Sequence, residues 1–193
     1  MLNQLNGTMK TCTLRIGVFC EQIVKIFLTI VINLGTLAVV FGQQVERYGN
    51  IAFLPPGDWV KNEGNGYLAF TKINQESGEF GRIILYQAET SSGSLDEDFK
   101  GDWQSLIETN YQPKELTDFS KTSFNSEWNA VIGVAPYVYQ NQNQAVVLVT
   151  LSNGRQKISY VFLSNTTAYE KELEDFGSSL ELSSFSLPTA ISS

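Results

Sequence analysis

The stretch "AVVLVTLSNGRQKISYVFL", residues 145–163, carries the clearest structural signal in the chain. Two apolar runs that are rich in β-branched residues, Ala145–Leu151 and Lys157–Leu163, flank the sequence Ser-Asn-Gly-Arg at 152–155. Asn-Gly between two such runs predicts a β-hairpin. Both runs are apolar at successive positions, which is typical of strands that are covered on both faces. We therefore expect a central antiparallel hairpin with a layer packed on each side.

Two amphipathic helices are expected to form these layers. One begins after Ser94, which has Glu97 three residues on, and the other begins near Thr166 and Thr167, where Glu170 lies three residues after Thr167. This spacing is that of a capping box, which marks the start of a helix. Apolar residues at helical spacing should then face the sheet. They are Leu95, Phe99, Trp103, Leu106 and Ile107 in the first helix and Tyr169, Leu173, Phe176 and Leu180 in the second.

The remaining strands are shorter or less regular. Gly66–Ile73 and Phe80–Ala88 are expected to form a second hairpin, and a short strand should end at the Pro-Pro-Gly turn in front of it. A long strand is expected over 126–140, with Pro136 at a bulge or at the sheet edge, and a weak edge strand near Leu116–Phe119. The predicted fold class is α+β: an antiparallel sheet of about six strands flanked by helices, an α/β/α sandwich.

This order of elements resembles a known family. The features that carry the resemblance are "FLPPGDW" at 53–59, "GYLAFTK" at 66–72, a helix with an internal tryptophan, and a closing strand-strand-helix. Together they are similar to the PsbP/Mog-like sandwich, and broadly to DcrB-like exported envelope proteins of bacteria, over residues 49–182. The resemblance implies a binding or accessory role, because members act as photosystem II extrinsic subunits or bind Ran, and as a rule they are not enzymes. It carries no functional residue over to this chain.

Residues 25–42 have the order of a secretion signal. Lys25 supplies a positive charge, residues 26–41 are uncharged and largely apolar, and Gly42 is a small residue before Gln43, where we expect cleavage. The alternative is a retained membrane anchor, but a spanning helix needs about 20 predominantly apolar residues, and this run is shorter. We therefore expect a periplasmic or secreted protein, attached to the membrane only if the signal stays uncleaved.

The segment in front of the signal, residues 1–24, shows no helical or strand period that would add it to a domain. We interpret it as a start-site artefact, because a GTG codon at Val24 would open an ordinary signal peptide. The alternative is a genuine extended n-region. After the signal we expect a short linker at 43–48, one domain at 49–182 and a flexible tail at 183–193.

The composition excludes several functions. Removal of residues 1–42 leaves 151 residues, enough for one domain with a core. The removed segment contains three of the 13 basic and one of the 20 acidic residues, so its removal changes the net charge from −7 to −9. Such a chain is repelled by nucleic acid and by anionic membrane surfaces, and no nucleic-acid partner is expected.

The chemistry of catalytic and metal sites is limited as well. Both cysteines, Cys12 and Cys20, fall in the removed segment, and the chain has no histidine. Ser-His-Asp and Cys-His catalysis are thereby excluded. The usual zinc and copper sites are excluded for the same reason, and no cofactor is predicted.

Two pairs of residues are candidates for a binding site. Asp58 and Trp59 follow a rigid turn and could form a sugar- or peptide-binding edge, although a tryptophan there more often plugs the end of a core. Tyr137 and Tyr139 lie two apart, hence on one face of a strand. They could line a recognition surface, although packing under a helix is the commoner outcome.

Three consecutive acids, Asp96, Glu97 and Asp98, offer a possible calcium site at the start of the first helix. Calcium loops, however, space their oxygen ligands at alternate positions around a glycine. We therefore interpret these acids as charges that complement the helix dipole.

Two functions remain open. The first is an exported, non-catalytic binding or accessory protein of the bacterial cell envelope, with an unknown protein or small ligand as its partner. The second is a carboxylate-dependent envelope hydrolase, which needs two acids that face each other across a cleft. A deep pocket with two facing acids would favour the hydrolase, and a shallow aromatic patch would favour the binding protein.

Overall fold

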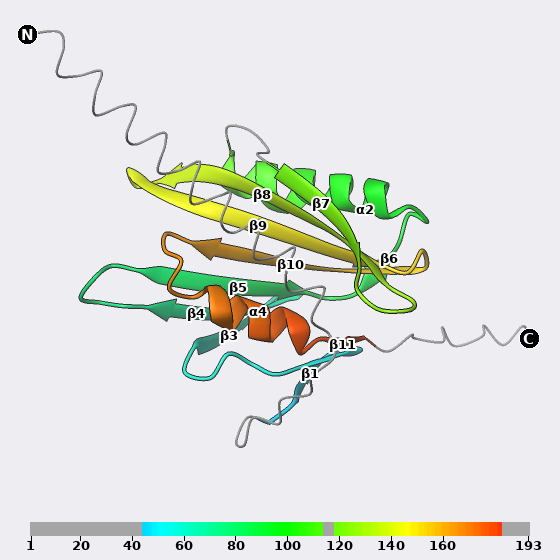
Figure 1. Cartoon of the computed structure of the whole chain (residues 1–193), viewed down its shortest axis with the longest axis horizontal. Coiled ribbons are helices and arrows are strands. Elements are labelled where there is room, and N and C mark those ends of the chain that lie inside the picture. The colour runs from blue at the N-terminus through cyan, green and yellow to red at the C-terminus, as the bar shows by residue number, and fades with distance from the viewer. Residues whose placement is uncertain (1–43, 114–117, 183–193) are drawn as a thin grey trace, which may run out of the picture.

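The structure is a computed structural model that describes residues 44–113 and 118–182. It is an α+β fold in which two helices pack on an eight-stranded antiparallel sheet, with a small three-stranded sheet beside it (Figure 1). The predicted signal, its cleavage site at Gly42 and Gln43, and the predicted tail lie outside the described residues. Across the described ranges, no helix is both long and apolar enough to cross a membrane.

The predicted central hairpin is present. β9 (Gln142–Ser152) and β10 (Gln156–Ser164) pair antiparallel, with Ser152 opposite Lys157. In the turn between them Gly154 has a φ of +79°, a left-handed conformation that glycine adopts without steric cost. The Asn-Gly signal and the two apolar runs therefore predict this hairpin correctly.

Further strands extend the hairpin or form the small sheet. They are β1 (Glu46–Tyr48), β2 (Ile51–Phe53), β3 (Val60–Gly64), β4 (Tyr67–Ile73), β5 (Phe80–Tyr86), β6 (Glu89–Thr90), β7 (Asp118–Ser123), β8 (Asn129–Tyr139) and β11 (Glu181–Leu182). The large sheet has the order β3-β4-β5-β10-β9-β8-β7, and β6 pairs with β10 beyond the end of β5. The small sheet has the order β1-β2-β11.

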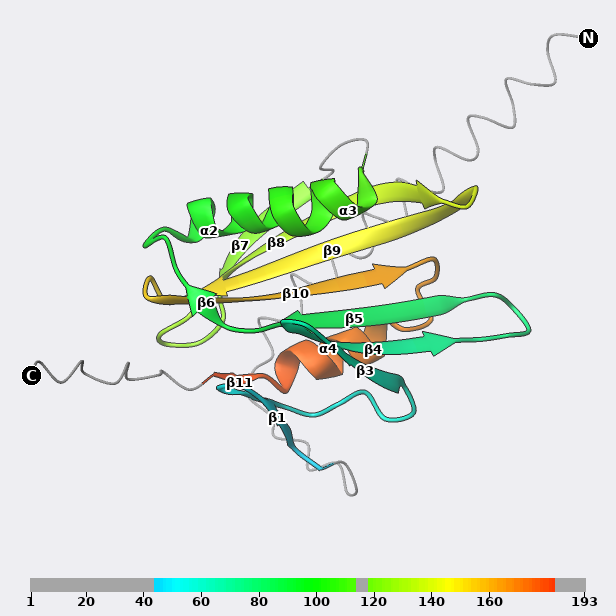
Figure 2. The same ribbon diagram turned by 180° about the vertical axis from the view of Figure 1, so that it is seen from behind.

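A long helix and a short helix flank the large sheet on opposite sides (Figures 1 and 2). Their segments are α2 (Leu95–Asp102), the π-helical turn η2 (Trp103–Glu108) and α3 (Thr109–Tyr111), which follow one another without a break, and the separate α4 (Glu170–Ser178). Neither predicted capping box forms. The side chain of Ser94 makes no capping bond, and the residue that caps α4 is Tyr169 rather than Thr167.

The apolar stripe of the long helix packs on the sheet as predicted. Phe99, Trp103 and Ile107 are buried, and the helix contacts β8 and β9. Gly133 of β8 allows this close approach, because a Cβ there would lie 2.5 Å from the Phe99 ring and 2.9 Å from the Trp103 ring. The prediction that Trp103 faces the sheet rather than water is confirmed.

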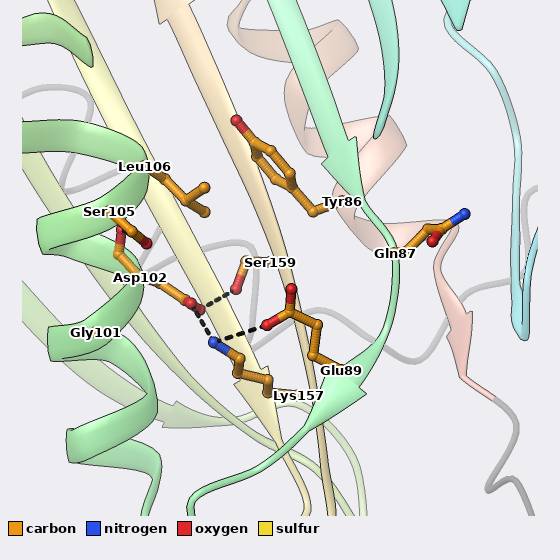
Figure 3. A pocket seen from close by; sticks show the side chains of 9 residues that line it. All are labelled: Tyr86, Gln87, Glu89, Gly101, Asp102, Ser105, Leu106, Lys157 and Ser159. Atoms are coloured by element: carbon orange, nitrogen blue, oxygen red, sulfur yellow. Dashed lines mark hydrogen bonds and ion pairs between the residues drawn. The ribbon is translucent and has the colours of Figure 1, made fainter. Parts of the chain in front are cut away.

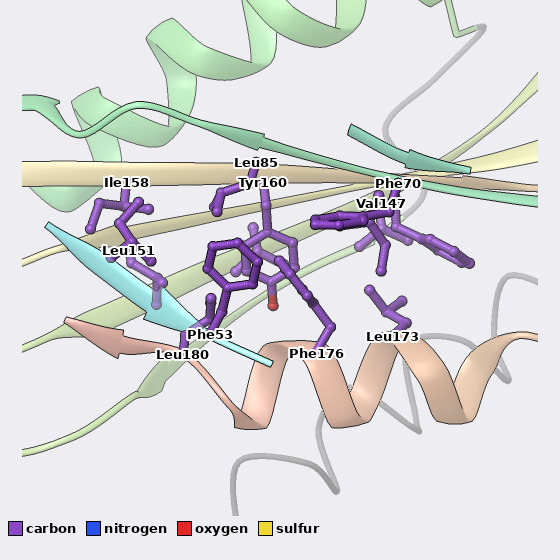
Figure 4. Packing of buried hydrophobic residues seen from close by; sticks show 14 of the residues in the cluster. Phe53, Phe70, Leu85, Val147, Leu151, Ile158, Tyr160, Leu173, Phe176 and Leu180 are labelled. Carbon is purple, nitrogen blue, oxygen red and sulfur yellow. The ribbon is translucent and has the colours of Figure 1, made fainter. Parts of the chain in front are cut away.

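The stripe of α4 is buried on the opposite face of the sheet (Figure 4). The ring of Phe176 lies 5.6 Å from that of Phe53 in the small sheet and 6.2 Å from that of Phe70 in β4, measured between centroids. Full burial of a side chain of this kind stabilises a fold by about 1.5–3 kcal/mol. The central strands thus have one apolar core on each face.

The predicted count of about six strands is wrong, and so is the plain α/β/α sandwich. The large sheet has eight strands, and α4 shares its outer layer with the three-stranded sheet. The sequence does not predict β3, because Val-Lys-Asn-Glu-Gly shows no apolar face, and β6 and β11 have only two residues each. The segment 43–48, expected as a linker, contains β1.

Candidate functional site

The first predicted pair is divided between surface and core. Asp58 is exposed and accepts a bond from the Lys72 ammonium at 2.8 Å, which lowers the pKa of its carboxyl. Trp59 is buried, with its ring edge-on to Tyr169 at a centroid distance of 5.6 Å. A Cβ on Gly81 would lie 2.7 Å from the Trp59 ring. Trp59 therefore closes the end of the core beside α4 and leaves Asp58 alone on the surface.

The second predicted pair is divided in the same way. Tyr137 is buried, its hydroxyl donates to Oε1 of Gln144, and its ring lies 5.4 Å from that of Tyr111. Tyr139 is exposed at the end of β8. Trp59 belongs to the core under α4, whereas Tyr137 belongs to the core under the long helix. The structure therefore does not bring the four predicted residues into one site.

The acidic start of the long helix includes a buried anchor. The carboxylate of Asp98 accepts bonds from Ser91 Oγ at 2.5 Å, from the backbone amide of Ser92 at 2.7 Å and from Ser152 Oγ at 2.8 Å. Burial alone would raise the pKa of Asp98, but these bonds lower it. Asp98 thus ties the helix to the central hairpin. In the described part of the chain, no group of three or more His, Cys, Asp or Glu side chains is placed to hold a metal ion.

A pocket of about 250 Å³ lies between the long helix and a break in the neighbouring strand (Figure 3). β5 ends at Tyr86, and β6 resumes the pairing with β10 at Glu89, so the chain leaves the ladder at residues 87–88. This break opens the wall of the pocket. Its lining residues are Tyr86, Gln87, Glu89, Gly101, Asp102, Ser105, Leu106, Lys157 and Ser159.

Asp102 is the centre of a charged network in this pocket (Figure 3). It is only 4% exposed. Its carboxylate accepts bonds from Lys157 Nζ, from Ser159 Oγ at 2.5 Å and from Thr150 Oγ1 at 3.1 Å. Lys157 also contacts the carboxylate of Glu89 at 3.2 Å. One ammonium therefore bridges two acids, and both oxygens of the buried acid have partners.

This network keeps Lys157 protonated. Burial alone would lower the pKa of Lys157, but the hydrogen bond to Asp102 and the attraction of both acids raise it above its ordinary value. A lysine that serves as a general base needs a pKa lowered towards neutrality. Lys157 therefore does not serve as a general base for Ser159. The two acids share a cation instead of facing each other across a substrate.

The sheet beside the pocket is uncovered on this side. In Figure 2 the long helix runs along β8 and β9, and on its side of the sheet no helix of the described chain lies over β3, β4 and β5, whereas α4 lies behind them. We call this region the open face and define it by the side chains of these three strands that point to the same side as Tyr86 and are at least partly exposed. They are Val60, Asn62, Tyr67, Thr71, Ile73, Phe80, Arg82 and Tyr86.

Large apolar side chains of the open face are accessible to water. Val60 and Ile73 are 71% and 54% exposed. Tyr67, Phe80 and Tyr86 are partly buried, and the rings of the two tyrosines lie 6.4 Å apart. Contiguous apolar surface rimmed by polar groups marks interaction sites on soluble proteins. The open face is a shallow aromatic patch that joins the pocket through Tyr86.

A solved structure shares this fold. The chain is similar to a protein from Bacteroides thetaiotaomicron VPI-5482, whose crystal structure is known at 1.50 Å resolution. The TM-score is 0.50 and the sequence identity 15%, and the match covers 75% of this chain and 50% of the other, so this chain spans about half the length of that protein. No family model and no curated protein matches the chain. The likeness therefore extends to the fold alone, and the resemblance to the PsbP/Mog-like sandwich stays a prediction.

Neither the pocket nor the open face is predicted from the sequence, although the sequence contains a signal for the pocket. Asp98 and Asp102 lie four residues apart, each directly before an aromatic residue of the buried stripe, and Lys157 and Ser159 alternate with apolar residues in β10. Polar side chains on the inward faces of two elements indicate a buried polar network. No local signal marks the open face, because its exposure depends on where the long helix lies.

Proposed function

We propose that this protein is an exported, non-catalytic binding protein of the bacterial cell envelope, and that the open face with its adjoining pocket is its ligand site. Export rests on the order of charge and apolar residues over 25–42. The finer assignment to the PsbP/Mog-like, DcrB-like sandwich belongs to this proposal, and it is supported by an antiparallel sheet that carries a helix on each face.

The observation that carries the proposal is the uncovered half of an otherwise sandwiched sheet. Under the long helix and under α4 the apolar side chains are buried, yet on the open face Val60 and Ile73 stand in water beside three half-buried aromatic rings. Leaving such surface exposed costs about 25 cal/mol per Å² relative to burial. A ligand or partner that covers it would recover this free energy.

The alternative function, a carboxylate-dependent hydrolase, has weaker support. The pocket does contain two acids, but Asp102 and Glu89 both contact Lys157, and the remaining partners of Asp102 are Thr150 and Ser159. A glycosidase-type pair leaves room between its carboxyl groups for the scissile bond. Here an ammonium takes that place, which favours a structural role for the network.

A ligand-retention experiment tests the proposal. The protein purified after expression of the full chain is incubated with an extract of the producing cell's envelope, desalted and examined by native mass spectrometry. We expect a retained mass on the wild type and its loss in Val60→Glu, because the new charge must be desolvated on the open face. Val138→Glu is the matched control, since Val138 is 54% exposed in β8, outside the open face.

Two outcomes would reject the proposed site. Either no mass is retained by the wild type, or the same mass is retained by Val60→Glu and by Val138→Glu. Conversion of a component of the extract by the wild type, but not by Asp102→Asn, would support the hydrolase instead.

A further inference from the structure

Arg82 on the open face is a cation without a partner. Within residues 44–113 and 118–182 no hydrogen bond or ion pair engages its side chain, and its Nε atom is buried. Lys157, the cation of the pocket, is by contrast neutralised by Asp102 and Glu89. The terminal Nη1 and Nη2 atoms of this half-buried side chain of Arg82 also have no protein partner in the described chain, but they are not among the buried atoms, so a ligand can reach them. Arg82 is therefore the one position on the open face where a negatively charged group would gain most.

The surroundings of Arg82 strengthen this attraction. Its neighbours on the same face are Phe80 and Ile84 along β5, and Thr71 and Leu163 stand opposite it on the two adjacent strands. None of them is an acid, although the chain has 20 acidic and 13 basic residues. Apolar neighbours exclude water and lower the local dielectric, so a charge brought to this guanidinium is held more strongly than on an ordinary surface.

From this geometry we infer that the open face binds a small organic molecule with one carboxylate group and an apolar body, and that the carboxylate sits on Arg82. The inference deepens the proposed function and rests on it. A planar guanidinium donates two parallel bonds to a carboxylate, which fixes its orientation. The apolar body then lies on the rings of Tyr67, Phe80 and Tyr86, which prefer such contact over water.

A single carboxylate fits this place better than a phosphate. Phosphate sites commonly use the free amides at a helix N-terminus. Arg82 instead lies near the C-terminal end of the long helix. Tyr111 is in the last turn of that helix, where burial raises its pKa and the nearby charge of Arg82 acts to lower it. A helix C-terminus carries partial negative charge, which disfavours an anion of higher charge.

Matched pairs of soluble probes test the inference. The full-length protein is titrated calorimetrically with octanoate and octan-1-ol, and with 3-phenylpropanoate and 3-phenylpropan-1-ol. We expect each acid to bind at least about tenfold more tightly than its alcohol, because bonds to charged groups are the strong ones. Arg82→Gln should weaken binding of the acids by about ten- to a hundredfold and leave the alcohols unchanged. Arg82→Lys should retain part of the preference.

Arg155→Gln is the matched control, because it removes the same charge from the exposed turn of the central hairpin, and it should bind both acids like the wild type. Thermal melts establish that every variant is folded. The inference is overturned if acids and alcohols bind equally, if Arg82→Gln binds the acids like the wild type, or if neither acid binds at millimolar concentration. Retention of the envelope-derived mass by Arg82→Gln would overturn it while the proposed function stands.

Discussion

Asp102 and Glu89 bind the same ammonium from opposite surroundings. The side chain of Asp102 is 6% exposed and that of Glu89 is 69% exposed. Coulomb attraction is weak in water and strong in a buried site, but removal of one member of a buried pair also strands the other. The two acids therefore contribute very differently to stability, although both contact Lys157.

Matched substitutions of the two acids measure this difference. Asp102→Asn should lower the free energy of unfolding by about 3–5 kcal/mol, the range for breaking a buried pair. Glu89→Gln should change it by less than about 1 kcal/mol, as exposed pairs do. Urea denaturation of both variants at neutral pH supplies the comparison. Equal effects would mean that Asp102 is as well solvated as Glu89 and that the network is not buried.

Single residues also show where sequence reasoning reaches its limit. Helical spacing alone places Trp103 correctly, on the same face as Phe99. Trp59 and Asp58 are neighbours in sequence, yet one is buried and the other exposed. That outcome depends on Tyr169, which the fold brings to Trp59 from more than a hundred positions away. Arg82 gave no signal at all, because an unpaired charge is defined by what surrounds it in space.

At the scale of elements, the long helix packs on the sheet through two aromatic rings that lie directly over a glycine of β8. The rings of Phe99 and Trp103 lie 5.7 Å apart, and both occupy the space that a side chain at Gly133 would need. Interiors are packed too densely to absorb such a change. This contact fixes where the helix lies, and hence which strands stay uncovered.

Loss of this contact should be severe. Trp103→Ala would leave a large cavity and lower the free energy of unfolding by about 3–5 kcal/mol. Native stability is only about 5–15 kcal/mol, so the variant should be barely folded. Chemical denaturation is the measurement, with Leu95→Ala, at the partly buried start of the same stripe, as a milder control. A change below about 1 kcal/mol for Trp103→Ala would contradict the packing described here.

Elements with local signals were predicted, and elements defined by pairing were not. The hairpin of β9 and β10 has its turn and both apolar runs within one short stretch. β3 is exposed along most of its length and is a strand only because it pairs with β4. The open face exists because the long helix lies over β8 and β9 and not over β3 to β5. No local sequence pattern predicts that position of the helix.

On the scale of the whole molecule, the distribution of perturbed side chains predicts how stability depends on pH. Burial raises the pKa of Tyr86 to about 12, and it also raises the pKa of Tyr137 and Tyr160. The network raises that of Lys157. A group whose pKa is raised on folding contributes stability that is complete below its unfolded value, about 10 for tyrosine and lysine, and that is lost as the pH rises towards the folded value.

The free energy of unfolding should therefore be nearly constant at neutral pH and fall above about pH 10. Urea denaturation at a series of pH values measures it. Tyr86→Phe should flatten the alkaline decline, because it removes a group that ionises at a lower pH in the unfolded chain than in the folded protein. Identical alkaline profiles for the wild type and Tyr86→Phe would contradict the burial of Tyr86.

For Asp98, which titrates at the acid end, the sign is reversed. The pKa of Asp98 is lowered on folding, so its contribution is present above the unfolded value of about 3.9 and is lost as the pH falls through the folded value. Asp98→Asn should therefore reduce stability at neutral pH and make it depend less on pH in acid. Urea denaturation extended to below about pH 4 measures this pH dependence. If the wild type and Asp98→Asn lose stability equally in acid, the anchoring role of Asp98 is contradicted.

Hydrogen exchange with and without the envelope extract tests most directly whether the open face is the ligand site. Bound ligand slows the opening of the backbone that it covers. If the ligand binds there, we expect added protection in β4, in β5 and in the strand break at residues 87–88, with α4 and β7 unchanged. Protection confined to the α4 side or to β7, or no added protection anywhere, would contradict this assignment of the site.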